Sequence, residues 1–181
     1  PELNDMAATL TKVKAVKPDI LVVSGHARGA TMVVRQVSDM KVDVPMLAIT
    51  HCDSAKVAET LAKAAEYALC AAQWDRSLGY KDRWFGTAEE YAKWFEKEFR
   101  YDPPYQAAES TAALLVYVDA LERAGSFDIE KVREAIAKTD LMTFYGPVKF
   151  DATGKNIAKP MVLYQIQDGK YKVVAPTKWA S

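Results

Sequence analysis

The sequence predicts an α/β protein that has a parallel sheet with flanking helices, then a helical block, then a C-terminal β-hairpin. In the first part, helical patterns alternate with short, wholly apolar runs, which is typical of parallel strands connected by helices and buried on both faces. Helical patterns also dominate from Thr87 to about residue 138. Near the end, Asp168-Gly169 separates two strand patterns and is a strong signal for a two-residue hairpin turn.

Size and charge limit the classes of protein to consider. The chain has 181 residues, is 50% hydrophobic, and carries 24 basic and 24 acidic side chains. This length suits one domain or two small lobes. Zero net charge with dispersed lysines argues against a nucleic-acid partner, and no apolar run approaches the roughly 18 residues that a membrane-spanning helix needs. The termini carry no pattern that indicates the compartment.

The parallel block begins with a helix that Asn4 or Asp5 can cap and that Pro18 ends. The run DILVVS then has the β-branched composition of a strand buried on both faces by helices. The other elements expected in this block are a helix over about 28–40, a strand over 46–49, a helix capped by Asp53 or Ser54 that includes Val57 and Leu61, and a strand over 67–72.

The character of the sequence changes after Trp74. The segment WDRSLGYKDRWFG fits neither a helical nor a strand period, so we expect a long loop. Its four aromatic residues argue against disorder. They suit the lining of a ligand cavity, and they equally suit a plug at the junction between two lobes.

The remaining elements have clear boundary signals. Thr87 and Glu90 form a capping box that begins a helix reaching about Phe99. We expect further helices over 105–124, ended by Gly125, and over about 128–138. Strand patterns cover 145–151, 161–167 and 170–175, and their order predicts antiparallel structure.

The two cysteines, Cys52 and Cys70, are too few for a disulfide framework, and their spacing matches no zinc site. We expect both to be buried thiols.

In open parallel sheets, ligands bind outside the carboxyl ends of the strands, where helix N-termini present unpaired N–H groups. The segment that follows the first predicted strand brings backbone donors, His26 and Arg28 to one helix start. This combination suits a carboxylate better than a cation. The alternative interpretation is a turn eased by its glycines, with Arg28 facing solvent.

The second strand is followed by Thr50-His51-Cys52-Asp53. A histidine, a thiol and an acid this close together raise the possibility of a metal site or a Cys–His nucleophile. Neighbouring loop residues rarely point at one ion, however, and the only other histidine is His26. Asp53 as a helix cap is the leading interpretation, and the sequence predicts no catalytic residue, metal or cofactor.

Taken together, three pieces of sequence carry a resemblance to a known family. They are KPDILVVSG, YGPVKFDATGKN and the hairpin around Asp168-Gly169, in this order. The chain resembles, over essentially its whole length, the C-terminal half of a type I periplasmic solute-binding protein, in particular the leucine/isoleucine/valine receptors of ABC importers. That family has two Rossmann-like lobes joined by three crossings, with the ligand between them, and its complete members are about twice as long.

The resemblance implies that residues 1–73 and 160–181 belong to the second lobe, and that residues 77–156 belong to the first lobe, whose amino-terminal sheet is absent. The helices after Thr87 would then expose an apolar surface that monomers seldom tolerate. We therefore expect a fragment, or a chain that obtains its missing surface from the N-terminal lobe or from a partner chain. The resemblance also implies a periplasmic location and permease subunits of an ABC importer as partners.

The resemblance further implies a set of ligand contacts. His26 falls where leucine-type receptors place an aromatic contact. Thr50 falls near the acid that holds the ligand's ammonium, whereas Asp53 comes three residues later. Without that acid an ammonium would lack a buried partner, so we expect an aromatic or other carboxylic acid as ligand, ahead of a branched-chain amino acid. The candidate ligand-binding residues are His26, Arg28, Thr50, His51, Trp74 and Gln106.

The function expected from these features is capture of a small solute by closure of two lobes, without catalysis. Two alternatives stay open at this point. One is a ligand-sensing domain of a receptor or regulator with the same fold. The other is a doubly wound α/β enzyme that uses His51, Cys52 and Asp53.

Overall fold

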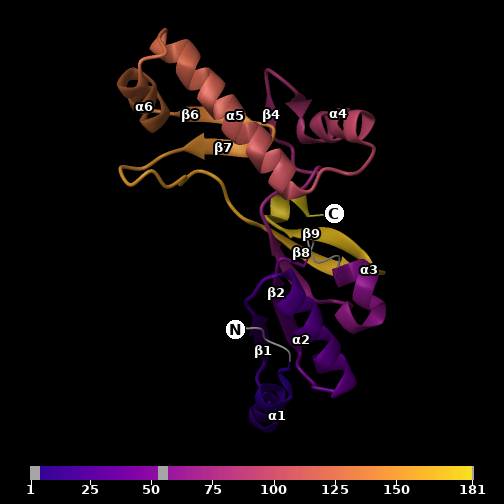
Figure 1. The fold of residues 1–181 in the computed structure, drawn as a ribbon. Helices are drawn as coiled ribbons and strands as arrows, with labels where there is room; N and C mark the ends of the chain where they lie inside the picture. Colours follow the sequence, from indigo (N-terminus) through magenta and orange to yellow (C-terminus); the bar gives the residue numbers. More distant parts are fainter. Residues whose placement is uncertain (1–4, 53–56, 181) are drawn as a thin grey trace. The chain divides into compact units, whose positions relative to one another are not determined.

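The computed structural model describes residues 5–52 and 57–180 (Figure 1). The chain divides into two compact units: unit 1 comprises Pro1–Gln73 and Met161–Ser181, and unit 2 comprises Trp74–Pro160. Asn4, Asp53 and Ser54, three of the predicted helix caps, lie outside the described residues. Within the described ranges, no helix is both long enough and apolar enough to cross a bilayer.

Unit 1 contains one five-stranded sheet with the strand order β1-β2-β3-β8-β9. Strand β2 pairs in parallel with both β1 and β3. Strand β8 pairs antiparallel with β3, and β9 pairs antiparallel with β8 at the edge of the sheet. The α/β class and the parallel core are therefore confirmed. The strands are β1 (Ile20–Val23), β2 (Met46–Thr50), β3 (Leu69–Ala72), β8 (Val162–Gln167) and β9 (Lys170–Ala175).

The helices of unit 1 pack against one another, with α2 in contact with α1, α3 and η1. Val33, Val34 and Val37 have the helical spacing of one face of α2, and all three are buried. Asp5 accepts a hydrogen bond from the Ala7 N–H at the start of α1, at 3.0 Å. The helices are α1 (Ala7–Val16), α2 (Ala27–Asp39), α3 (Val57–Leu61), the 3₁₀ helix η1 (Ala62–Ala65) and the 3₁₀ helix η2 (Thr177–Trp179).

The parallel strands of unit 1 are buried on one face only. Val23 and Ile49 are buried, whereas Ile20 is 51% exposed and Val22 is 65% exposed. Met46, the Cα partner of Ile20, is 42% exposed on the same face. The prediction of strands buried on both faces was therefore wrong for this part, because an apolar run reports which side chains favour burial and not whether a second layer is present. The open face carries Ile20, Val22, Met46, Ala48, Leu69 and Ala71.

The hairpin between β8 and β9 confirms the turn prediction. Asp168 has φ 52° and Gly169 has φ 69°. Positive φ values at both central residues match the twist of a two-residue hairpin, and Asp-Gly is among the pairs that adopt them most readily. This turn lets β8 and β9 continue the sheet beyond β3, although they are distant from β3 in sequence.

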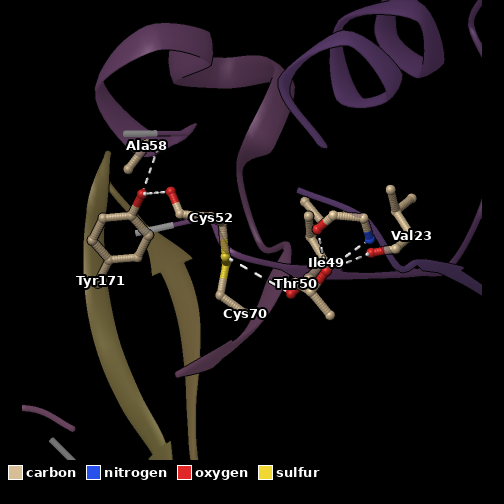
Figure 2. Close-up of a disulfide and its surroundings, with 8 residues drawn as sticks. Val23, Ile49, Thr50, Cys52, Ala58, Cys70 and Tyr171 are labelled. Atoms are coloured by element: carbon tan, nitrogen blue, oxygen red, sulfur yellow. Dashed lines mark hydrogen bonds between the residues drawn. A yellow bond between two sulfur atoms is a disulfide. The ribbon is translucent and has the colours of Figure 1, made fainter. Parts of the chain in front are cut away.

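Cys52 and Cys70 form a disulfide (Figure 2), so the expectation of free thiols was wrong, although both residues are fully buried as predicted. Ile49 on β2 is the Cα partner of Cys70 on β3. The chain turns at His51, with φ 58°, and places Cys52 with its Cα 6.0 Å from that of Cys70. The sequence could not predict this pairing because it depends on the strand register and on that turn.

Removal of the disulfide is expected to destabilise unit 1. The cross-link closes a loop with a sequence separation of 18 residues, so a Cys52→Ala/Cys70→Ala variant should lose about 3 kcal/mol of unfolding free energy. Urea unfolding with and without a dithiol reductant tests this. The wild type should lose stability when it is unfolded under reducing conditions, whereas the variant should be insensitive to the reductant. Equal stability of the two proteins without reductant would contradict the prediction.

Unit 2 contains three helices and two short hairpins. The capping box at α4 is present: the Glu90 N–H donates to the Thr87 hydroxyl at 3.1 Å, and the Thr87 N–H donates to the Glu90 carboxylate at 2.6 Å. Gly125, at φ 57°, ends α5 as expected. The elements are β4 (Lys81–Asp82), β5 (Gly86–Thr87), α4 (Ala88–Phe99), α5 (Tyr105–Ala124), α6 (Ile129–Ala137), β6 (Asp140–Thr143) and β7 (Gly146–Lys149).

Three strands of unit 2 were not predicted. Strand β4 and the first residue of β5 lie in the segment expected to be a long loop, but each strand has only two residues, too few for a recognisable period. Strand β6 follows α6 closely and pairs antiparallel with β7. Its sequence, DLMT, does not have the alternation that marks a longer strand.

An aromatic cluster forms the centre of unit 2. The ring of Tyr91 stacks on that of Phe144 with centroids 3.9 Å apart, and Trp74 and Phe85 pack edge-on against both rings. The indole N–H of Trp74 donates to the Phe144 carbonyl oxygen at 3.2 Å. Asp82 joins the β4–β5 hairpin to this cluster, because its carboxylate accepts from the Phe85 and Phe144 N–H groups at 2.8 Å.

Arg76 joins three acidic side chains of unit 2. Its guanidinium contacts Glu89 at 2.6 Å, Glu96 at 2.8 Å and Asp102 at 2.7 Å. The hydrogen bonds from Arg76 lower the pKa of Glu89 and of Glu96 below the ordinary value of 4.5. Burial raises the pKa of Asp102, which partly opposes this effect.

The contribution of the Arg76 ion pairs to the stability of unit 2 should decrease in acid. Carboxylates with lowered folded pKa values contribute stability above the unfolded pKa, and this contribution is lost as the pH falls through the folded pKa. Arg76→Met should therefore lower the thermal midpoint at neutral pH, with the difference from wild type shrinking below about pH 4. Arg83→Met, which removes an exposed pair with Glu122, is the matched control and should change little. A difference that is independent of pH would contradict the assignment.

Candidate functional site

The candidate site lies in unit 1, where β1 and β2 end. Val23 is the Cα partner of Ile49 in this parallel pair, so the segments that leave the two strands begin side by side at one edge of the sheet. They lead into the predicted residues His26 and His51. This is the edge at which ligands bind in open α/β sheets.

The hydroxyl of Thr50 holds the two segments together (Figure 2). It accepts a hydrogen bond from the Gly25 N–H at 3.0 Å and donates to the Gly25 carbonyl oxygen at 2.8 Å. A threonine hydroxyl can do both because it carries one donor and two lone pairs. Thr50 thus satisfies both backbone polar groups of the residue that precedes His26.

The structure brings His26 and His51 together. Their ring centroids are 5.4 Å apart, with the ring planes tilted by 57°. His26 is exposed at the N-cap position of α2, and His51 is half-buried. His51 also has φ 58°, a left-handed conformation that is uncommon outside glycine and that recurs at functional sites.

The start of α2 adds a preference for negative charge. His26 makes no side-chain hydrogen bond that caps the helix. The N–H groups of a first helical turn have no partner within the helix and carry the positive end of the helix dipole. Arg28 lies in this first turn, and its side chain is exposed. The helix dipole, the N–H groups and the guanidinium all favour an anion such as a carboxylate.

The disulfide excludes Cys52 from the two kinds of chemistry considered for this loop, a Cys–His nucleophile and a metal site. Cys52 is in a disulfide, so it offers no thiolate for a Cys–His nucleophile or for a metal. Asp53 lies outside the described residues. Among residues 5–52 and 57–180, no group of three or more histidine, cysteine, aspartate and glutamate side chains is arranged to hold a metal ion.

The other two candidate residues lie in unit 2. Trp74 is only 4% exposed and is part of the aromatic cluster described above, so the structure gives it a packing role. Gln106 is exposed in the first turn of α5. Ligand contacts by these two residues stay predictions.

The sequence analysis missed Tyr171, on β9. Its hydroxyl donates to the Cys52 carbonyl oxygen at 2.7 Å and accepts from the Ala58 N–H at 3.1 Å. These partners are more than 100 positions away in the sequence, at separations of 119 and 113 residues. No local pattern indicates such a contact, because it depends on the placement of the β8–β9 hairpin beside β3.

The fold is that of the type I periplasmic binding protein class, of which this chain contains a part. A family model described as periplasmic binding protein matches residues 1–170, and the chain belongs to this family.

Solved structures support the same fold. A leucine-binding protein, LivK, from Thermotoga maritima is 23% identical, with a TM-score of 0.80 over 97% of this chain and 50% of that chain. A LivJ substrate-binding protein from Streptococcus pneumoniae, solved with isoleucine, is 20% identical, with a TM-score of 0.75 over 95% of this chain and 49% of that one. An R. palustris solute-binding protein, solved with benzoate, is 15% identical, with a TM-score of 0.74 over 96% of this chain and 47% of that one. The chain thus spans about half the length of these proteins.

Loss of the Thr50 hydroxyl should loosen the edge of the sheet. Thr50→Val keeps the side-chain shape but leaves the Gly25 N–H and carbonyl without this partner, so we expect a loss of about 1–2 kcal/mol of unfolding free energy. Thr11→Val, which removes an exposed hydroxyl bonded within α1, is the control and should change stability by less than about 0.5 kcal/mol. Urea unfolding measures both, and equal small effects would contradict the role given to Thr50.

Proposed function

We propose that this chain is the C-terminal half of the solute-binding component of an ABC importer, and that it captures a small carboxylic acid between two lobes. Unit 1 would belong to the second lobe, and unit 2 would belong to the first. The observation that carries the proposal is the site at the ends of β1 and β2, where two histidines and Arg28 lie at the N-terminus of a helix. Such a site binds an anion without needing a nucleophile or cofactor.

The open face of the unit 1 sheet supports the half-protein part of the proposal. It exposes Ile20, Val22 and Met46, and contiguous apolar surface of this kind usually marks an interface. The similar proteins of known structure are about twice as long as this chain. We propose that further parts of a longer protein, or a partner chain, cover this face and supply the remaining ligand contacts.

The residues at the site favour an acid without an ammonium group. Neither residues 24–28 nor residues 50–52 include a carboxylate, so this part of the site offers no partner for a buried ammonium. The two imidazole rings provide flat, polarisable surface for an aromatic or apolar body, and Arg28 suits its carboxylate. A benzoate-like acid therefore ranks ahead of leucine or isoleucine, although related folds have been solved with ligands of both kinds.

The disulfide supports an exported location. Disulfides persist in oxidising compartments such as the bacterial periplasm and are rare in the reducing cytosol. The Cys52–Cys70 bond is fully buried in unit 1. We therefore propose a periplasmic protein that delivers its ligand to the permease subunits of an importer.

Calorimetry on the full-length protein tests the proposed ligand class. Benzoate should bind more tightly than leucine, and Arg28→Gln should weaken benzoate binding by about 10- to 100-fold, because a charge-assisted hydrogen bond is lost. Arg35→Gln is the matched control, since Arg35 is also exposed on α2 but lies beyond its first turn. It should leave the affinity unchanged.

Two results would count against this proposal. Tight leucine binding with no binding of benzoate would reverse the predicted order of ligands. Binding of neither compound, nor of other small carboxylates, would remove the proposed solute-binding function.

A further inference from the structure

We propose that Tyr171 and the Cys52–Cys70 disulfide are positioning elements that set the geometry of the ligand loop, and so the affinity for its ligand. The ligand loop is defined as residues 50–52, which follow β2. The proposal rests on the ligand-binding function proposed above. It adds residues that would not touch the ligand but would hold in place the residues that do.

The hydroxyl of Tyr171 links the two ends of a connection. It donates to the carbonyl oxygen of Cys52 and accepts from the N–H of Ala58, the second residue of α3 (Figure 2). The Val57 N–H also donates to the Cys52 carbonyl, at 2.9 Å. The end of the ligand loop and the start of α3 are thereby tied to one phenol group on β9.

The disulfide attaches the same residue to β3. Cys52 is bonded to Cys70, which lies within a strand that is paired on both sides, with β2 and with β8. Both cysteines are fully buried, so the bond is shielded from reductants in the folded protein and acts as a permanent attachment. Cys52 is thus held at its sulfur by β3 and at its carbonyl by β9.

This double attachment acts directly on the predicted ligand contacts. His51 lies between the anchored Cys52 and Thr50, which is itself bonded to Gly25. With both neighbours held, His51 keeps the left-handed conformation that places its ring 5.4 Å from that of His26. A loop held in its binding geometry before the ligand arrives loses less conformational entropy on binding, and this raises affinity.

Tyr171→Phe in the full-length protein tests the proposal. The variant keeps the ring and removes only the hydroxyl, so the Cys52 carbonyl and the Ala58 N–H lose this partner. We expect about fivefold weaker benzoate binding, mainly through faster dissociation, and about fivefold faster amide hydrogen exchange at Gly25. The histidine ring signals of His26 and His51 should also shift in NMR spectra.

Two controls separate positioning from general stability. Val173→Ala truncates a buried side chain on the same strand and should lower the thermal midpoint at least as much as Tyr171→Phe does. It should leave benzoate affinity and Gly25 exchange within twofold of wild type. Tyr67→Phe makes the same chemical change at an exposed residue of unit 1 and should change neither quantity.

The outcomes distinguish this proposal from the proposed function. Wild-type affinity and Gly25 exchange in Tyr171→Phe would overturn the positioning role, as would equal losses of affinity in Tyr171→Phe and Val173→Ala. If the wild type binds none of the small carboxylates or amino acids tested, the proposed function fails. The exchange and NMR measurements then still decide whether Tyr171 positions the loop.

Discussion

The register between β1, β2 and β3 is the constraint on which the rest of unit 1 depends. Val23 pairs with Ile49, and Ile49 pairs with Cys70, so the carboxyl ends of β1, β2 and β3 lie at one edge of the sheet. At that edge the chain passes from β1 into α2 and from β2 into the ligand loop. A shift of one residue would turn every side chain of a strand to the opposite face and would separate Thr50 from Gly25.

Long-range contacts then convert this edge into a defined site. The hydroxyl of Thr50, the disulfide and the hydroxyl of Tyr171 each join segments that are distant in the sequence. Their combined effect is to hold the segments that leave β1 and β2 in fixed positions. Unit 2 is stabilised differently, by aromatic rings packed around Tyr91 and Phe144 and by the carboxylates that bind Arg76.

The prediction that failed for the unit 1 sheet is informative about the protein. The strands have the composition of a sheet covered on both faces, yet Val22 is 65% exposed. The composition of these strands shows that their side chains favour burial. Only the structure shows whether a second layer of this chain covers them. The difference between the two agrees with the chain's match to about half the length of its structural relatives.

The sequence by itself determined those parts of the fold that depend on interactions between neighbouring residues. The capping box of Thr87 and Glu90, the turn at Asp168-Gly169 and the apolar face of α2 follow from neighbouring residues, and so does the α/β class. Only the tertiary structure decided that the cysteines pair, that β8 lies beside β3 and that Tyr171 reaches Cys52. Those contacts depend on strand register and on backbone turns between distant segments, which no local pattern of side chains specifies.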